Sequence, residues 1–361
     1  MSVSNQQICG RHRNLWLHYF ALVTAGMTFP LIFMGGLVTS HSAALAVPDW
    51  PTSYGYNMFL FPWHKMVGGI FYEHSHRLIA SLVGFLTMIL AIWLWLEEPR
   101  RWLKWLGWIA LALVVFQGVL GGLRVVLLKQ PIAIFHACLA QFFFCFVSAI
   151  ALFTSPWWKR LGDVFPKRPD GMFRKLVLGT TVLIFIQLIF GATMRHTNSG
   201  LAVPDFPWIY GKIFPPLDST ALEQLNQERI WQWNMEPISF QQLAVHLAHR
   251  VGALIIALAV FTILWVVRRD HWECKELRFL VLGLTGLVMI QVALGIFVIW
   301  TEKAADIATA HVAVGALTLV TSVLLTLVSF KLLVSQARHI SSLSLTNRLI
   351  ANLAAHERVV L

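Results

Sequence analysis

Long apolar stretches separated by short polar segments dominate the pattern of the chain. A helix that crosses a bilayer needs roughly 20 apolar residues. Eight stretches meet this length, at about 15–39, 74–96, 102–128, 132–154, 173–195, 242–267, 277–300 and 306–334. The first lacks the small-residue cleavage site of a signal peptide, so we expect it to remain as a spanning helix. The pattern predicts an all-α membrane protein with eight transmembrane helices.

The same pattern occurs twice along the chain. Leu-Ala-Val-Pro-Asp-Trp-Pro at 45–51 returns as Leu-Ala-Val-Pro-Asp-Phe-Pro at 201–207, an offset of 156. Residues 73–77 match 246–250 at an offset of 173, and His136 matches His311 at 175. Each copy holds four predicted helices, an even number, so both copies run in the same direction through the bilayer, as in a parallel repeat. We predict two pseudo-symmetric four-helix bundles.

The repeat divides the chain into five parts. The N-terminal bundle covers 15–154 and the C-terminal bundle covers 173–334, with a head at 1–14, a linker at 155–172 and a tail at 335–361. The second outer loop is longer than the first, and its extra segment at about 218–235 starts like a capped helix. Proline flanks the Asp-aromatic pair in both outer loops, which predicts a rigid turn with Trp50 and Trp208 at the membrane interface.

Composition and charge agree with a membrane protein. Apolar residues make up 57% of the chain and charged residues 12%, whereas an average soluble domain is about 25% charged. The net charge of +11 comes from basic residues in short loops between apolar stretches, so we expect a lipid bilayer and no nucleic acid as the partner. Of the 28 Lys and Arg, 19 lie on the side of the two termini and 7 on the other. The positive-inside rule therefore places both termini in the cytoplasm.

Four of the 14 histidines lie near the outer starts of alternate predicted helices. His76 and His136 belong to the first bundle, and His249 and His311 belong to the second. A charged side chain at this depth costs on the order of 2.5–3.5 kcal/mol, so each imidazole needs a partner. A core hydrogen bond would satisfy a single histidine, but two facing histidines in a four-helix bundle favour haem iron bound from both sides. Zinc would need more ligands, although His246 offers a third in the second bundle.

Several further residues lie near these histidines in the pattern. Gln-x3-Gly occurs at 117/121, 187/191 and 291/295, and it fits either the approach of a flat ring to the backbone or tight helix packing. Glu73 precedes His76 by three residues, so both share a helix face, and the second half has His246 in its place. A carboxylate there could move protons, or it could be a solvated residue at a helix N-terminus. Four arginines could pair with haem propionates or extend to the interface: Arg77, Arg250, Arg124 and Arg195.

Taken together, these motifs resemble the haem A synthase family over roughly residues 15–334. The resemblance implies an inner-membrane oxidoreductase that converts the C8 methyl of haem O to a formyl group, through an alcohol, and so makes haem A for terminal oxidases. It implies that His249 and His311 hold haem b, that His76 and His136 flank the substrate, and that Glu73 is catalytic. Many members carry a cysteine pair in the first outer loop, but this chain has none between 40 and 75. It is therefore similar to the cysteine-free branch.

The resemblance also implies partners, and two alternative functions have to be weighed against it. We expect haem O to come from a haem O synthase and electrons to come from an unidentified donor, with a homo-oligomer left open. The main alternative is a bis-His di-haem electron carrier without turnover, but carrying electrons across the membrane needs haems at different depths, and all four histidines lie on the outer side. A transporter would need broken helices or an acidic site at the midplane, and the acidic residues lie near the ends of the spans.

Overall fold

A computed structural model describes residues 2–161, 171–213 and 218–357. Most of these residues are α-helical, and within the described ranges no strand forms apart from two isolated β-bridges. Parts of the predicted linker (162–170) and tail (358–361) lie outside the described residues. The expected all-α fold class is confirmed for the described chain.

Eight helices are long and apolar enough to cross a membrane, as predicted. They are α1 (Ser2–Ser40), α2 (Gly69–Glu97), α3 (Arg101–Leu127), α4 (Gln130–Thr154), α6 (Gly171–His196), α8 (Phe240–Asp270), α9 (Lys275–Trp300) and α10 (Ala305–Glu357). Two shorter helices are α5 (Pro156–Arg160) and α7 (Ser219–Trp231). The chain is therefore a multi-pass membrane protein.

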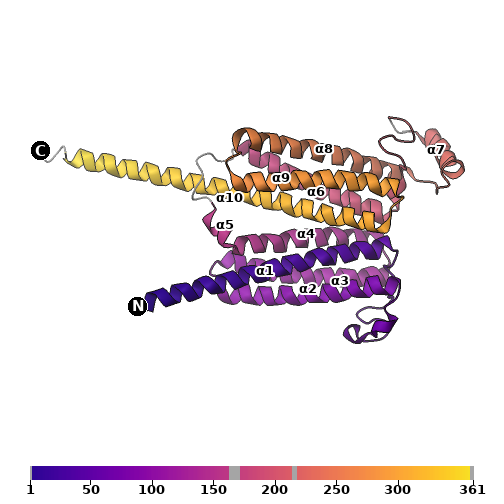
Figure 1. The fold of residues 1–361 in the computed structure, drawn as a ribbon, viewed down its shortest axis with the longest axis horizontal. Coiled ribbons are helices and arrows are strands. Elements are labelled where there is room, and N and C mark those ends of the chain that lie inside the picture. Colours follow the sequence, from indigo (N-terminus) through magenta and orange to yellow (C-terminus); the bar gives the residue numbers. More distant parts are fainter. Residues whose placement is uncertain (1, 162–170, 214–217, 358–361) are drawn as a thin grey trace.

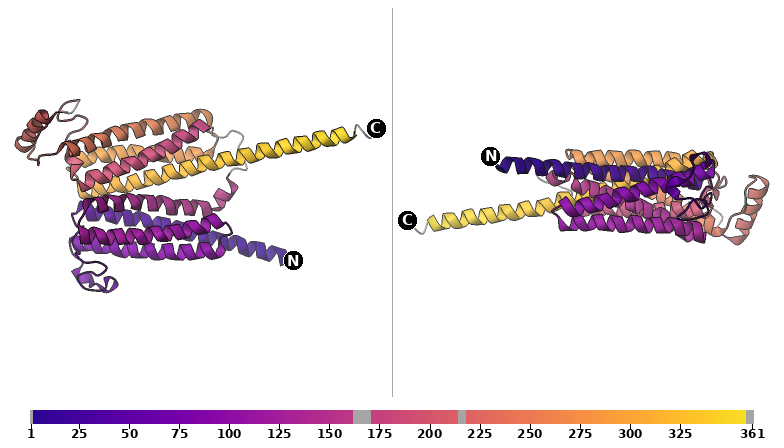
Figure 2. Two further views of the ribbon diagram at one scale, coloured as in Figure 1. Left: turned by 180° about the vertical axis from the view of Figure 1, so that it is seen from behind. Right: turned by 90° about the horizontal axis from the view of Figure 1, so that it is seen from below.

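The eight long helices form two groups that lie side by side (Figure 1). Helices α1, α2, α3 and α4 contact one another in a ring, and so do α6, α8, α9 and α10. The two groups meet where α1 and α4 pack against α10 and where α4 packs against α6. The start of α1 and the end of α10 extend from the same end of the molecule, and α7 lies at the opposite end (Figure 2). We call that opposite end, which carries residues 41–68, 197–213 and 218–239, the loop end.

The two most buried helices, α10 and α4, pack against each other where the two groups meet, although α6 at the same boundary is only 17% buried. In α10, 61% of the most apolar window is buried, and in α4 44%, compared with 17% in α3 and α9. The outer helices turn large apolar side chains away from the protein, such as Leu254 and Leu258 on α8 and Phe279 on α9. Exposed apolar surface of this extent is stable only in a lipid environment.

The predicted turn forms in both loops at the loop end. Asp49 accepts hydrogen bonds from the backbone N–H groups of Tyr54 (2.7 Å) and Gly55 (2.9 Å). Asp205 accepts the same two bonds from Tyr210 (2.9 Å) and Gly211 (2.8 Å) in the second loop. Each carboxylate therefore closes a turn of the same design.

The helix expected within about 218–235 is also present, as α7. The side chain of Asp218 caps its N-terminus by accepting a hydrogen bond from Ala221 N–H at 2.7 Å. At the loop end, Trp50 is 43% exposed and Trp208 is 52% exposed. Both indoles therefore lie partly uncovered at the loop end of the spans, and tryptophan is favoured at the ends of membrane-spanning helices.

Candidate functional site

The four predicted histidines form two pairs near the loop end. His249 on α8 and His311 on α10 face each other with ring centroids 6.4 Å apart and planes at 64°. His76 on α2 and His136 on α4 are close enough to interact electrostatically. Each histidine lies between the seventh and tenth residues of its helix, so each is about 9–14 Å from the helix start.

A glycine on the neighbouring helix supports each of these four imidazoles. A methyl group added at Gly35 would lie 3.1 Å from Cε1 of His76, and one added at Gly295 would lie 3.2 Å from Cε1 of His311. A methyl group added at Gly121 would lie 3.3 Å from Cε1 of His136, and one added at Gly191 would lie 3.3 Å from Cε1 of His249. These separations are tighter than an ordinary side-chain contact, so any larger residue would displace a ring. The glycines therefore fix where each imidazole lies.

Glutamines one turn before three of these glycines hold the histidine helices. Gln117 Nε2 donates to the carbonyl oxygen of His136 at 2.7 Å, and Gln187 Nε2 donates to that of His249 at 2.8 Å. Gln291 Nε2 lies 3.4 Å from Nε2 of His311. The Gln-x3-Gly motif therefore contacts a histidine at both of its positions. The glutamine contacts the backbone or ring of the histidine, and the flat ring that packs on each glycine is the imidazole.

The histidines fit a metal-bearing group held between two helices. The Nδ1 atoms of all four histidines are buried, and each imidazole interacts with a backbone group on the neighbouring helix, as metal-bound histidines usually do: His76 with Leu31, His136 with Gln117, His249 with Gln187 and His311 with Gln291. A metal bonded to two opposed imidazole nitrogens at about 2.0–2.1 Å each would hold the ring centroids about 6 Å apart, which agrees with the 6.4 Å between His249 and His311. The donor set is imidazole, which suits iron as it does zinc, copper and nickel.

His246 does not complete a zinc site with its neighbours. Its Nδ1 lies 3.0 Å from the carbonyl oxygen of Ser199, and its Nε2 accepts a hydrogen bond from Arg250 Nε at 3.0 Å. Both ring nitrogens are therefore engaged. Among the described residues, no group of three or more His, Cys, Asp or Glu side chains is arranged to hold a metal ion. Ligation by two histidines therefore stays a prediction.

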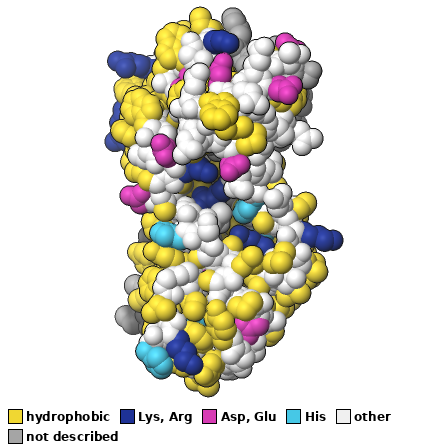
Figure 3. All heavy atoms as spheres, turned by 90° about the vertical axis from the view of Figure 1, so that its right-hand side faces the viewer, with side chains coloured by type: hydrophobic (Ala, Val, Ile, Leu, Met, Phe, Trp, Pro, Cys, Tyr) yellow, Lys and Arg dark blue, Asp and Glu magenta, His cyan; other side chains and the backbone are white. Residues whose placement is uncertain are grey.

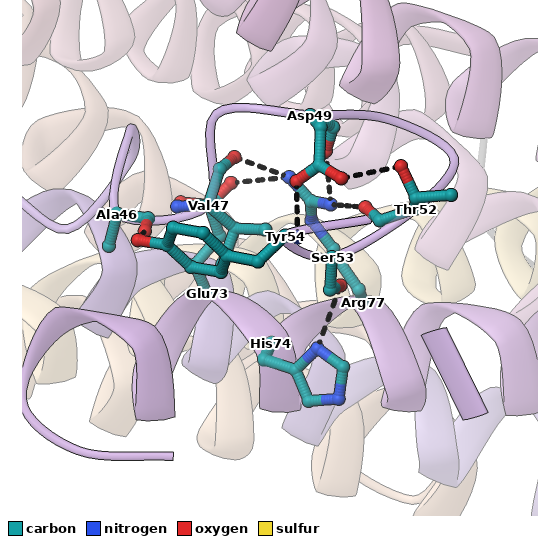
Figure 4. Close-up of polar contacts among 9 residues, drawn as sticks. All are labelled: Ala46, Val47, Asp49, Thr52, Ser53, Tyr54, Glu73, His74 and Arg77. Carbon is teal, nitrogen blue, oxygen red and sulfur yellow. Dashed lines mark hydrogen bonds and ion pairs between the residues drawn. The ribbon is translucent and has the colours of Figure 1, made fainter. Parts of the chain in front are cut away.

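Glu73 is buried within a network that joins α2 to the first loop (Figure 4). Its Oε1 pairs with Arg77 Nη2 at 2.8 Å, and its Oε2 accepts the Val47 N–H at 2.9 Å. Arg77 also donates to the carbonyl oxygens of Val47 (2.8 Å), Asp49 (2.7 Å) and Thr52 (2.9 Å). The carboxylate is thus held in a defined place, and the arginine fixes the loop above it.

The second half uses the same arrangement with a different partner. Arg250 donates to the carbonyl oxygens of Val203, Asp205 and Trp208, and its Nε bonds to His246 where Arg77 has Glu73. Both arginines therefore anchor an outer loop through its backbone. Their pairing with haem propionates stays a prediction. The contacts that Arg77 and Arg250 make in the structure are with loop carbonyl oxygens.

Arg124 and Arg195 lie where the two halves meet. Arg195 Nη2 donates to the carbonyl oxygen of Gly36 at 2.5 Å and to Ser40 Oγ at 2.6 Å, so it ties α6 to α1. Arg124 is close enough to interact electrostatically with both Arg195 and Glu73. Figure 3, which views the molecule from the loop end, shows Lys, Arg and His side chains gathered near the middle. An anionic group bound at either histidine pair would meet this positive region.

Sequence reasoning missed two features of the site. Gly35 lacks the preceding glutamine, with Leu31 in its place, but it lies 156 residues before Gly191, so the repeat offset could have revealed its role. No sequence signal linked Gly36 to Thr309, although a methyl group at Gly36 would lie 2.8 Å from Thr309 Cγ2. That contact joins helices from opposite halves.

Known proteins resemble this chain over most of its length. The model of the cytochrome oxidase assembly protein family matches residues 18–323. A protein named "Heme A synthase" from Halalkalibacterium halodurans is 29% identical over 310 residues, which are 83% of this chain and 92% of the relative. Another with that name, from Shewanella oneidensis, is 27% identical over 328 residues, 85% of this chain and 94% of the relative.

A third relative named "Heme A synthase", from Beijerinckia indica, is 28% identical over 320 residues, covering 78% of this chain and 82% of the relative. The family match includes all four histidines of the two pairs, Glu73 and both outer loops. The chain therefore belongs to the COX15-CtaA family of cytochrome oxidase assembly proteins.

Proposed function

We propose that this protein is a haem A synthase, which oxidises the C8 methyl of haem O to a formyl group through an alcohol. The observation that carries the proposal is the two matched histidine pairs, each ring packed on a glycine, with a carboxylate beside only the first pair. The relatives named "Heme A synthase" support it over more than three quarters of the chain.

The two halves divide the work in this proposal. His249 and His311 hold haem b in residues 173–334, and His76 and His136 flank haem O in residues 15–154. When bound, the haem groups supply iron centres that pass single electrons. The glycines behind the four histidines keep the imidazoles fixed, so that little reorganisation is needed on binding. Arg77, Arg124, Arg195 and Arg250 supply the positive charge near the propionates.

Glu73 is the residue that handles protons in this proposal. Removing hydrogen from a methyl group needs a proton acceptor, and a buried carboxylate within reach of the substrate can act as one. Glu73 Oε1 stays paired with Arg77, while Oε2 accepts a hydrogen bond only from the Val47 N–H. Turning Oε2 from that amide toward the substrate would break one hydrogen bond from a neutral donor and would leave the ion pair with Arg77 intact.

The site lies toward the outer face of the inner (cytoplasmic) membrane in this proposal. The excess of Lys and Arg on the side of the termini supports cytoplasmic head, linker and tail segments. The shared loop hydrogen bonds of Asp49 and Asp205 and the shared glycine contacts support a parallel internal repeat of two four-helix bundles. Haem O would then reach the first bundle from a haem O synthase in the same membrane.

Haem extraction is the experiment that tests this function. The protein is expressed in a host that makes haem O and lacks haem A, and the haems of the purified protein are separated by chromatography. Haem A or its alcohol precursor supports the proposal, and Glu73→Gln should retain bound haem without forming either. Haem B alone, in two equivalents per chain, would instead support a bis-His electron carrier.

A further inference from the structure

The indole of Trp50 lies directly against the backbone of Gly122 on α3. A methyl group added at Gly122 would overlap Trp50 Cδ2 and would lie 2.6 Å from both Cε2 and Cε3. No side chain can occupy this position without moving the indole. Gly118, one turn earlier on the same helix, has nothing within 4 Å of an added methyl group. The requirement for glycine at 122 therefore comes from Trp50 and not from general crowding along α3.

Trp50 lies between the residues that bind the first loop to α2. Asp49 and Thr52 give their carbonyl oxygens to Arg77, and the Val47 N–H donates to Glu73. The loop is thus fastened to α2 through its backbone and through the Ser53 hydroxyl, 3.1 Å from His74 Nδ1, and to α3 through the Trp50 indole. The two attachments make the loop a bridge across the outer ends of α2 and α3.

The α3 attachment is next to a residue that supports a histidine. Gly121, the neighbour of Gly122, is the glycine on which His136 packs, with 3.3 Å from the added methyl position to Cε1. Two successive residues of α3 therefore contact the loop on one side and the histidine on another. A shift of α3 against the loop would also shift the support of His136.

The second half lacks the two residues that form this bridge. Phe206 stands where the first half has Trp50, and Ile296, at an offset of 174, stands where it has Gly122. Arg250 lies over the Phe206 ring, with its guanidinium carbon 5.8 Å from the ring centroid. A branched side chain at 296 leaves no flat backbone surface for an indole. The bridge is confined to the half that carries Glu73.

We infer that Trp50 is a positioning residue for Glu73. Packed on Gly122, its indole holds the first loop across α2 and α3, so that the Val47 amide stays on the carboxylate. The consequence for catalysis rests on the proposed function, but the bridge itself does not. Without the indole contact, the loop keeps only its α2 attachment, and the amide should open more often.

Amide hydrogen exchange on the full-length protein in lipid nanodiscs tests the bridge. We expect Trp50→Ala and Gly122→Ala each to speed exchange at Val47 by about tenfold or more, as local opening becomes easier. Exchange at Tyr54, whose amide is bonded to Asp49 within the loop, should change little, which separates detachment from unfolding. Gly118→Ala should match the wild type. Unchanged Val47 exchange in both single variants would overturn the inference.

A double variant tests whether Trp50 is the reason for Gly122. With the indole removed, Trp50→Ala/Gly122→Ala should exchange at Val47 no faster than Trp50→Ala alone, because the three atoms nearest to the added methyl group all belong to the indole. Trp50→Phe should restore part of the protection. Additive effects of the two substitutions would mean that Gly122 acts independently of Trp50 and would refute the bridge.

The catalytic part of the inference has its own measurement. In the haem O host, Trp50→Ala should lower the rate of haem A formation and alter its pH profile, while the absorption spectrum of the second-half haem stays that of the wild type. Loss of Val47 protection with an unchanged rate and pH profile would refute a positioning role for Trp50. If the wild-type protein forms no haem A, the proposed function fails while the exchange results still judge the bridge.

Discussion

The exchange of Glu73 for histidine separates the structural and chemical roles of this carboxylate. The second half supplies the design, because His246 takes the place of Glu73 and accepts a hydrogen bond from Arg250 at 3.0 Å. His246 also bonds to the carbonyl oxygen of residue 199 through Nδ1, and the first half has a backbone carbonyl at the equivalent position 43. We expect Glu73→His to keep the first loop anchored and to stop haem A formation.

The structure gives the size of the effect on stability. The side chains of Glu73 and Arg77 are 5% and 9% exposed, so Glu73→Ala leaves a buried guanidinium without its counterion, at a cost of about 3–5 kcal/mol in the free energy of unfolding. Glu73→His keeps a neutral acceptor for Arg77 and loses the acceptor of the Val47 N–H, which costs about 1–3 kcal/mol. Histidine should therefore be the milder substitution by about 2 kcal/mol.

Two assays on the same preparations decide the matter. Thermal unfolding in detergent ranks the stability of the wild type, Glu73→His and Glu73→Ala, and chromatography of extracted haems measures haem A and its alcohol precursor. His246→Glu, the reciprocal exchange in the second half, should still form haem A. Haem A at the wild-type level in Glu73→His would refute the proton-accepting role, and equal destabilisation by His and Ala would refute the anchoring role.

Three further predictions concern other parts of the site. Gly191→Ala should push the ring of His249 and weaken haem binding about 5- to 150-fold, the effect of about 1–3 kcal/mol of overpacking, whereas Gly283→Ala, with nothing within 4 Å, should not; equal titration curves for both would contradict the glycine support. His311→Ala should abolish the bis-imidazole absorption spectrum of the second half, and a retained spectrum would exclude this ligand. Burial raises the pKa of Asp49, but hydrogen bonds from Gly55, Thr52 and Tyr54 outweigh it and bring the pKa from 3.8 to about 2. Its contribution to the loop is therefore fully present above pH 3.8 and lost as the pH falls through about 2, so pepsin should cleave the loop faster only in that window, and Asp49→Asn should remove this pH dependence.

The elements of the fold were predictable because the signals are local. A bilayer leaves no water for backbone N–H and C=O groups, so every apolar stretch of sufficient length becomes a helix. The capped helix α7 and the turns closed by Asp49 and Asp205 also depend on residues within a few positions of one another. The offset between the two halves placed the four histidines in pairs before any contact was known.

The contacts around Glu73 were not predictable in the same way. Its position beside His76 on α2 follows from helical spacing, but its binding to the Val47 amide joins residues 26 positions apart. The four arginines were expected near propionates, and the structure adds that Arg77 and Arg250 hold loop carbonyls while Arg195 joins α6 to α1. A guanidinium has five donors, and the chain pattern alone does not reveal which acceptors they reach.

The sequence by itself determined the eight spans, the duplicated pattern and the candidate residues for the chemistry, because helix formation in lipid and helical spacing depend on neighbours along the chain. The tertiary structure decided how those residues are held: imidazoles on glycines, a carboxylate under a loop amide, and Trp50 on Gly122. These contacts join side chains from different helices. Their existence depends on the distance between packed backbones, and the second half has Phe206 and Ile296 where the first half has the Trp50–Gly122 pair.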